Sequence, residues 1–334
     1  MAEFFDSGDV DFNRYMQATE AKQRVKSAGI YVQALIDRAN NPTPPRHHLM
    51  PWAKTKGILQ FRPGEVTVWA GENGSGKSLV TGQVALSLCA QDTRVAIASF
   101  EMKPIKTMDR MGRQWTHYSL ADQQIMSDPT ERRETLSRYA DFKTWTDGKL
   151  WLYDQQGTVQ WRHVCAVARY AAQELRVQHF FIDNLAKCVK DEDDYNGQKA
   201  FVDELCAIAR DEDIHIHLVH HLNKSEGKPT KRAVKGSGSI TDQPDNLVYV
   251  HRNKTKERSA TKTATDADTL LIVDKQRNGE GWEGEIALWY LPRSQQFVGG
   301  HNCEPMEFIN SPDYDDERQR PLRPAARHFT ETDE

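Results

Sequence analysis

The segment Gly71-Glu-Asn-Gly-Ser-Gly-Lys77-Ser78 joins a predicted strand to a predicted helix. Before it, Val66-Thr-Val-Trp-Ala is apolar and β-branched, as in a buried strand. After it, Leu79-Val-Thr-Gly-Gln-Val-Ala-Leu continues as a helix. A G-x-x-x-x-G-K-[ST] loop in this context is typical of phosphate binding, because its glycines let backbone N–H groups surround phosphates at the start of a helix. The alternative is a glycine turn followed by a surface lysine.

Two residues of this loop have specific chemical tasks. Lys77 is expected to reach the β- and γ-phosphates of a nucleoside triphosphate, and the Ser78 hydroxyl is expected to bind Mg²⁺. The implied cofactors are therefore ATP, or another nucleoside triphosphate, and Mg²⁺. The loop positions that we expect to bind the nucleotide are Gly71, Asn73, Gly74, Ser75, Gly76, Lys77, Ser78 and Leu79.

Two acidic residues follow apolar strand sequences. Asp183 ends His179-Phe-Phe-Ile-Asp183 and is expected to hold Mg²⁺ through water. Glu101, in Ser99-Phe-Glu101-Met, is expected to act as the general base that orients the attacking water, because ligands gather at the carboxyl ends of parallel strands. The alternatives are a capping role for Asp183 and a solvated strand end for Glu101.

Strand and helix patterns alternate along the first part of the chain, which predicts an α/β fold with a mostly parallel twisted sheet flanked by helices. After His220 strand patterns follow loops, so we expect a β-rich C-terminal extension. The expected strands are 66–70, 95–100, 150–153, 179–183, 214–220, 247–251, 270–274 and 286–290. The expected helices are 77–89, 104–115, 130–142, 159–175 and 198–211, with a further helix at 19–39.

Composition excludes several classes of protein. The 334 residues carry 44 Lys and Arg against 48 Asp and Glu, so a globally basic nucleic-acid coat is excluded and any polyanion contact must be local. Apolar runs are too short for a transmembrane helix, which needs about 18 residues, and the N-terminus lacks signal-peptide features. The five cysteines lie far apart without a C-x-x-C pair, so we expect no zinc ribbon and a reduced cytoplasmic setting.

Residues 55–300 resemble the RecA-type motor domain of ring-shaped replicative helicases, the family of DnaB, the bacteriophage helicase-primases and mitochondrial Twinkle. The resemblance rests on six blocks in the family's order. These are Gly71–Ser78, Ser99-Phe-Glu101-Met, Phe181-Ile-Asp183-Asn, Leu218-Val-His-His221-Leu-Asn-Lys, Lys235-Gly-Ser-Gly-Ser-Ile240 and Lys275-Gln-Arg277-Asn-Gly. The resemblance implies a RecA-like P-loop NTPase core. The Pro-rich stretch 40–46 and the loss of periodicity after Glu304 divide the chain into three expected parts: an N-terminal arm with a linker helix (1–45), the motor (46–303) and a disordered acidic tail (304–334).

The resemblance also implies roles for single residues. Glu101 matches the family's catalytic glutamate, and His221 matches the sensor of the γ-phosphate. Lys275 and Arg277, two positions apart on an extended stretch, should face one side and act on the nucleotide of the adjacent subunit, with Arg277 as arginine finger. Arg252 and Tyr290 match positions that hold the sugar–base end of the nucleotide, although Tyr290 could equally be a core aromatic.

A basic segment after the sensor is the expected DNA-binding loop. In the family this segment lines the central channel, where Lys and Arg can follow a single-stranded backbone without reading its sequence. The expected DNA-binding residues are Lys224, Lys228, Lys231, Arg232 and Lys235. A solvated loop is the alternative, and the basic stretch from Arg252 to Lys262 is expected to be an exposed hairpin loop.

Taken together, the motifs favour an NTP-driven replicative DNA helicase that moves on single-stranded DNA as a ring, typically a hexamer. The compact layout favours a phage origin, and hence the cytoplasm of a bacterial host. No primase sequence precedes the motor, so a separate primase and a replicative polymerase are the expected partners, with no membrane. The alternatives are a RecA-type strand-exchange filament and a non-enzymatic ATP-binding scaffold; Glu101 argues against the scaffold, because a pure binder needs no positioned base.

Overall fold

The computed structural model describes most of the chain. The described residues are 3–5, 27–41, 47–189, 194–222, 228–230, 234, 236, 238–258, 265–279 and 281–308. The predicted channel-loop residues Lys224, Lys231, Arg232 and Lys235, the linker residues 42–46 and the tail beyond Phe308 lie outside the described residues.

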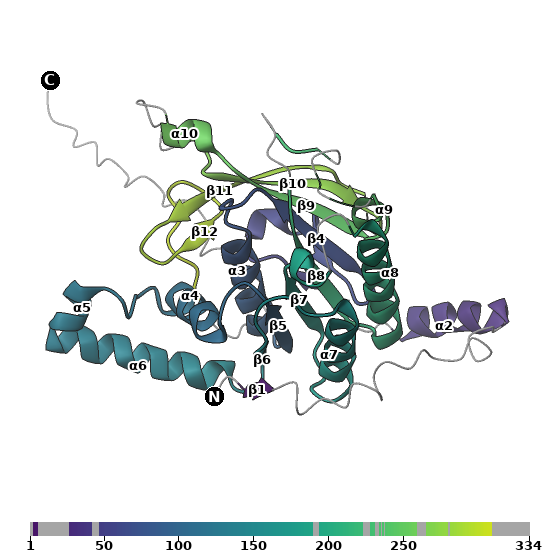
Figure 1. The fold of residues 1–334 in the computed structure, drawn as a ribbon, viewed down its shortest axis with the longest axis horizontal. Helices are drawn as coiled ribbons and strands as arrows, with labels where there is room; N and C mark the ends of the chain where they lie inside the picture. The colour runs from purple at the N-terminus through teal and green to yellow at the C-terminus, as the bar shows by residue number, and fades with distance from the viewer. Residues whose placement is uncertain are drawn as a thin grey trace, which may run out of the picture.

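A ten-stranded sheet forms the centre of the molecule (Figure 1). In spatial order its strands are β1 (Glu3–Phe5), β6 (Leu150–Tyr153), β5 (Val95–Ser99), β7 (His179–Asp183), β8 (His215–His221), β4 (Val66–Gly71), β9 (Asn246–Arg252), β10 (Thr269–Gln276), β11 (Gly284–Leu291) and β12 (Gln296–Val298). The pairings from β1 to β9 are parallel, and those from β9 to β12 are antiparallel. The predicted mostly parallel sheet with a β-rich C-terminal part is therefore confirmed.

Helices cover both faces of this sheet (Figure 1). One hydrophobic cluster joins the sheet to α7 (Trp161–Gln173) and α8 (Tyr195–Glu212). The other joins it to α3 (Lys77–Ala90), α4 (Pro104–Thr116) and α6 (Pro129–Thr146). Alternation along β4 explains this division, because Val68 packs into the first cluster and its neighbour Trp69 into the second. Burial on both faces also explains why β4 to β7 are rich in apolar residues.

The remaining elements are short. A two-stranded sheet pairs β2 (His48–Leu49) with β3 (Gln60–Phe61), and two 3₁₀ turns, η3 (Ala53–Thr55) and η4 (Leu185–Lys187), follow β2 and β7. Three short helices complete the described structure: α5 (Gln123–Ser127), α9 (Ser239–Asp242) and α10 (Lys254–Arg258).

Several expectations about the segments outside the central motifs were wrong. Residues 3–5, where no strand was expected, form β1 and pair with β6, whose outer edge would otherwise leave backbone groups unpaired. Short helices α9 and α10 occur after His220, where we expected only strands and loops. Met306 and Phe308 are buried, so the packed chain continues past the expected start of the tail at Glu304. The division of the chain into three parts stays a prediction.

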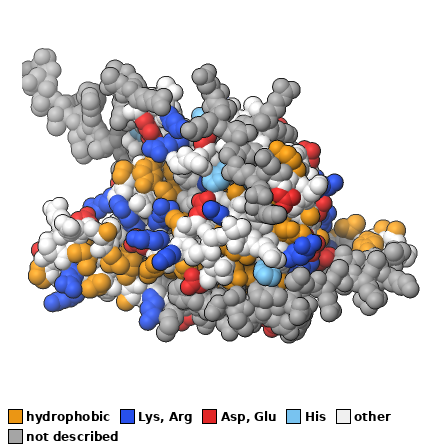
Figure 2. Space-filling view, viewed as in Figure 1, with side chains coloured by type: hydrophobic (Ala, Val, Ile, Leu, Met, Phe, Trp, Pro, Cys, Tyr) orange, Lys and Arg blue, Asp and Glu red, His pale blue; other side chains and the backbone are white. Residues whose placement is uncertain are grey.

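Helix α2 (Ala28–Asn40) is the described part of the predicted N-terminal helix, and it extends away from the sheet (Figure 1). None of its residues is buried, and its apolar side chains are visible at the surface (Figure 2). Tyr31, Val32, Leu35 and Ile36 lie on one side of the helix, and Leu35 is 65% exposed. Within the described residues, this helix therefore does not pack on its own domain. None of the helices in the described residues is long and apolar enough to cross a membrane.

Candidate active site

The glycine-rich loop lies between β4 and α3, as its sequence predicts. Gly74 and Gly76 have φ angles of 74° and 92°, values that side chains with a Cβ rarely adopt. A Cβ on Gly71 would lie 2.5 Å from Ser75 Oγ and 2.7 Å from the Val250 carbonyl oxygen. Ser75 Oγ is buried and has no hydrogen-bond partner within the described residues. The loop is thus a close-packed cradle with a polar group left for a ligand.

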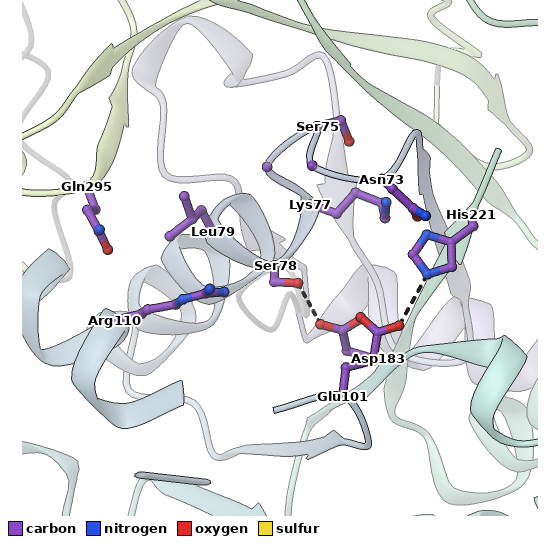
Figure 3. A pocket seen from close by; sticks show the side chains of 12 residues that line it. Asn73, Ser75, Lys77, Ser78, Leu79, Glu101, Arg110, Asp183, His221 and Gln295 are labelled. Carbon is purple, nitrogen blue, oxygen red and sulfur yellow. Dashed lines mark hydrogen bonds and ion pairs between the residues drawn. The ribbon is translucent and has the colours of Figure 1, made fainter. Parts of the chain in front are cut away.

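Lys77 begins helix α3 and folds back over the loop (Figure 3). Its Nζ donates to the carbonyl oxygens of Gly71 at 2.8 Å and Glu72 at 2.9 Å. Burial lowers the pKa of Lys77, and the nearby carboxylates, led by Asp183 and then Glu101, act in the opposite direction. A triphosphate would replace the two carbonyl oxygens with stronger, charged acceptors.

Ser78 and Asp183 meet beside the loop. The Ser78 hydroxyl donates to Asp183 Oδ2 at 2.7 Å, and burial raises the pKa of Asp183 although Ser78 and Lys77 favour its charged form. A hydroxyl and a carboxylate side by side are the oxygen donors that Mg²⁺ accepts. These two residues therefore fit a magnesium ion, which would also favour the charged carboxylate.

Glu101 and His221 converge on Asn184, a residue that the sequence analysis missed. The Asn184 side chain donates from Nδ2 to Glu101 Oε1 at 2.5 Å, and the same nitrogen lies 2.7 Å from His221 Nε2. His221 Nε2 is also 3.3 Å from Glu101 Oε1. The hydrogen bond with His221 is the largest cause of a lowered pKa for Glu101, so this carboxyl group stays ionised at neutral pH. Asn184 directly follows Asp183, so its place after a strand end was the signal that could have found it.

The glycine-rich loop with Lys77 and Ser78, and the side chains of Glu101, Asp183 and His221, line one cavity of about 460 Å³ (Figure 3). The wall also contains Arg110 from α4 and Gln295 from the turn before β12, neither of which the sequence analysis singled out. Arg110 extends toward Ser78, which brings a cation to the side of the cavity opposite His221 (Figure 3). The sequence did not predict that Arg110 lines this cavity, because Arg110 is distant in sequence from the loop that it faces.

A second cavity of about 340 Å³ lies on the other side of the glycine-rich loop. Both cavities are lined by Gly74, Ser75, Gly76 and Leu79. Arg252 and Tyr290 line the second cavity, where Tyr290 lies beside Phe297 with ring centroids 5.2 Å apart. The structure thus places both predicted sugar–base residues next to the phosphate loop.

Lys275 and Arg277 lie at the opposite end of the sheet. Lys275 Nζ and Arg277 Nη2 both donate to the carbonyl oxygen of Asp242, at 2.6 and 3.1 Å, so they face one side as expected. Gln276 pairs with Asn246 at the start of β9, whereas Arg252 at its other end donates to Gly74 O. The intervening strand spans about 20 Å. Arg277 is therefore too far away to reach its own phosphate loop.

Lys228 is the one predicted DNA-binding residue within the described parts of the chain. Its Nζ pairs with both carboxylate oxygens of Glu285 on β11, at 2.5 and 2.8 Å, and its side chain is 57% exposed. Contact with a DNA phosphate would require Lys228 to exchange this partner. The expected loop from Arg252 does connect two antiparallel strands, but it begins with α10.

The sequence matches one family model, that of the DnaB-like helicase C-terminal domain, over residues 54–299. Among curated proteins it is similar to "Replicative DNA helicase DnaB" of Treponema pallidum (strain Nichols), with 29% identity over 138 residues. That alignment covers 40% of this chain and 29% of the relative, so the chain matches only a part of that protein.

Solved structures show the same fold. One, whose title describes it as an "ATPase Domain", matches with a TM-score of 0.68 and 12% identity, over 82% of this chain and 99% of that one. A structure titled "The Structure Of A DnaB-Like Replicative Helicase And Its Interactions With Primase" matches with a TM-score of 0.66 and 14% identity, over 82% of this chain and 67% of that one. The expected RecA-like ATPase fold is therefore confirmed.

Proposed function

Because the chain belongs to the DnaB-like helicase C-terminal domain family, we propose that it is an NTP-driven replicative DNA helicase that moves along single-stranded DNA as a ring. The observation that carries this proposal is the separation of two sets of residues. Lys77, Ser78, Asp183, Glu101 and His221 surround one cavity, while Arg277 lies about 20 Å away at the far end of the strand. A complete site then needs a second copy of the chain.

In the proposed reaction Lys77 and the N–H groups of the glycine-rich loop bind the β- and γ-phosphates of ATP or another nucleoside triphosphate. Ser78, directly, and Asp183, through water, would hold Mg²⁺, which neutralises phosphate charge when bound. Glu101 orients the attacking water and accepts its proton. Its lowered pKa keeps the carboxyl group ionised at neutral pH, so that it is free to accept a proton.

Asn184 gives His221 a physical route to report the γ-phosphate. Its amide nitrogen contacts both Glu101 and His221, so a shift of His221 would also move the Asn184 amide and, through it, the catalytic carboxylate. His221 ends β8, and the chain continues from there toward the proposed DNA-binding loop. We propose that phosphate occupancy and DNA contact are coupled along this segment.

Arg277 would act on the nucleotide of the adjacent subunit. Its planar guanidinium matches the charge that spreads over the transferred phosphoryl group. In the single chain it is held by Asp242 O and by Asp245, whose Oδ1 lies 3.5 Å from Arg277 Nη1. Lys275 shares the Asp242 carbonyl, so both cations are aligned before a neighbour docks. If Arg277 were only an exposed charge at the end of a strand, this alignment would have no role in catalysis.

Helix α2 is the proposed link between subunits. Thirteen residues with an uncovered apolar side do not make a stable helix by themselves. A mainly apolar cavity of about 520 Å³ between α4, α6 and the turn before α5 is lined by Ile105, Met108, Leu120 and Phe142, and Ile105 is 69% exposed. We propose that α2 covers this cavity on the adjacent subunit.

The assembly can be tested without disturbing the motor itself. Leu35→Asp places a charge on the apolar side of α2 and should give mainly monomers by light scattering with nucleotide present. Ala34→Asp adds the same charge outside that side and should assemble normally. Equal assembly by both variants would show that α2 is not the link.

Single-stranded DNA would bind through Lys224, Lys228, Lys231, Arg232 and Lys235. This local charge suits a protein whose net charge is −4 overall. A separate primase and a replicative polymerase are the proposed protein partners, and the cytoplasm, of a bacterial host if the chain is phage-encoded, is the proposed location.

The experiment that tests the proposed function is strand displacement on a forked DNA. The wild-type chain with ATP and Mg²⁺ should separate the strands, and Lys77→Ala should not, although it should fold equally well by circular dichroism. DNA-stimulated hydrolysis without strand separation would favour the alternative, a strand-exchange ATPase of the RecA type. Absence of hydrolysis in the wild-type chain would contradict both.

A further inference from the structure

Helix α10 and the end of β9 contact the glycine-rich loop at two points. Arg252 Nη1 donates to Gly74 O at 3.2 Å, and Lys254 forms an ion pair with Glu72. Gly74 and Glu72 are both positions of the phosphate-binding motif. One cation at the end of β9 and one at the start of α10 are therefore bound to the loop whose conformation determines phosphate binding.

Glu257 determines how Arg252 is oriented. Its Oε1 accepts from Arg252 Nε at 2.5 Å, while the Nη1 of the same guanidinium reaches Gly74 O. Arg252 is about half exposed, so without Glu257 its long side chain would have many rotamers open to it. Glu257 and Arg252 both line the cavity of about 340 Å³ beside the loop.

The far side of α10 is fixed to the same cavity. Lys256 Nζ pairs with Asp268 Oδ1 at 2.7 Å, and Asp268 Oδ2 accepts from the Tyr290 backbone N–H at 2.8 Å. Helix α10 thus connects the glycine-rich loop on one side with the Tyr290 wall on the other. A five-residue helix gains this fixed position from its ion pairs, since it has little apolar surface to bury.

We propose that Glu257 is a positioning residue which, through Arg252, sets the affinity of this site for the sugar and base of a nucleoside triphosphate. This inference rests on the proposed function and concerns the same site. The cavity that Arg252 and Glu257 line adjoins the phosphate cavity across Gly74, Ser75, Gly76 and Leu79, where the rest of a nucleotide must extend. Glu257 keeps Arg252 beside that position before the nucleotide arrives, which reduces the entropy lost on binding.

Inorganic tripolyphosphate has the phosphates of the substrate without its sugar or base. It therefore distinguishes an effect of Glu257 on sugar and base binding from an effect on the glycine-rich loop. Glu257→Gln should weaken binding of a fluorescent ATP analogue about three- to fivefold, at the upper end of the range of an exposed ion pair. Its affinity for tripolyphosphate, measured by competition, should stay within twofold of wild type. In steady state KM should rise with little change in kcat. Thr255→Ala, at an exposed residue of the same helix, is the matched control and should change the affinity for neither ligand.

A double-mutant cycle tests whether Glu257 acts through Arg252. Arg252→Ala should weaken the ATP analogue at least as much as Glu257→Gln, and the double variant should bind no more weakly than Arg252→Ala alone. If the two substitutions reduce the affinity for the ATP analogue additively, the proposal is overturned. It is also overturned if Glu257→Gln weakens binding of the ATP analogue and of tripolyphosphate equally, because Glu257 would then stabilise the loop. A wild-type chain that binds neither ligand would overturn the proposed function and this inference together.

Discussion

Three histidines and Trp69 form a hydrogen-bonded chain on one face of the sheet, and a fourth histidine lies beside it; this buried cluster predicts that the fold loses stability in mild acid. Trp69 Nε1 donates to His217 Nδ1 at 3.2 Å, His217 Nε2 lies 3.1 Å from His179 Nδ1, and His179 Nε2 lies 2.8 Å from His48 Nδ1. An indole nitrogen can only donate, so each ring in this chain carries its single proton on Nε2.

His215 lies beside this chain, with its ring centroid 4.6 Å from that of His217, and makes separate hydrogen bonds. Its Nδ1 lies 2.7 Å from Arg62 O, which can only accept, so its Nε2 must accept from the Thr67 hydroxyl at 2.8 Å. Both ring nitrogens of His179, His215 and His217 are therefore engaged, and a second proton on any of them would break a hydrogen bond. One metal ion cannot explain the cluster, because His179 uses opposite nitrogens toward its two histidine partners.

Burial lowers the pKa of all three inner histidines, that of His215 to about 3. The neighbouring histidines add to this effect, whereas the hydrogen bond to the Arg62 carbonyl acts in the opposite direction on the pKa of His215. Because the unfolded chain binds these protons and the folded chain does not, stability is complete above about pH 6.5 and falls as the pH drops below it. Between pH 6 and pH 5 each histidine should cost about 1 kcal/mol, and the three together about 3 to 4 kcal/mol.

This loss is large against a typical stability of about 5–15 kcal/mol. Burial raises the pKa values of Asp183 and Glu65, so these two groups make the fold more stable as the pH falls. Their effect is largest at a lower pH, near the ordinary pKa of a carboxyl group. The assay is urea unfolding at pH values from 5 to 7.5. His215→Gln removes one of the three groups, so its loss between pH 6 and pH 5 should be smaller by about 1 kcal/mol, whatever its stability at pH 7.

His301→Gln, a change at an exposed histidine, is the control and should leave the slope unchanged. A slope for His215→Gln equal to that of the wild type would refute the reasoning, because the buried ring would then titrate equally in both states.

Three predictions concern the proposed activity. Lys77→Ala should abolish productive nucleotide binding, whereas Glu101→Gln should bind nucleotide and hydrolyse it very slowly; near wild-type turnover by Glu101→Gln would remove it from the base role. Arg277→Ala should assemble but lose DNA-stimulated hydrolysis by a factor of about 10³, and mixing it with Lys77→Ala subunits should restore some activity; mixed rings without any recovery would argue against action in trans. Replacing Lys228, Lys231 and Arg232 with Ala should weaken single-strand binding alike for every sequence and reduce the salt slope by about 0.7 for each lost phosphate contact. An unchanged salt slope would show that DNA binds elsewhere on the chain. Glu285→Gln removes the ion-pair partner of Lys228 and should not weaken DNA binding.

The central strands were predictable because their physical signal is local. β6 and β7 have the expected bounds, and β4, β5 and β8 differ by a residue at their ends. β4 to β7 are short apolar runs between loops, and burial on both faces keeps them apolar. β8 lies where we expected a strand, although four of its seven residues are histidines. The phosphate loop was predictable for a similar reason, since its chemistry is carried by consecutive residues.

Features that depend on strand order were not predictable from the sequence. β1 has three residues, too few for a pattern, and exists because β6 offers it an edge. The histidines of β7 and β8 meet Trp69 only because these strands lie in the order β7-β8-β4. Arg110 and Glu257 enter the site from separate elements, and no spacing in the sequence relates them to Lys77.

Electron microscopy of the wild-type chain with ATP, Mg²⁺ and single-stranded DNA tests the ring most directly. The phosphate loop and Arg277 lie at opposite ends of one sheet, and the uncovered side of α2 needs a neighbour, so successive subunits should join head to tail. The account predicts closed rings around the DNA, and Leu35→Asp should prevent their formation. Open helical filaments along the DNA would contradict the ring and support the strand-exchange alternative.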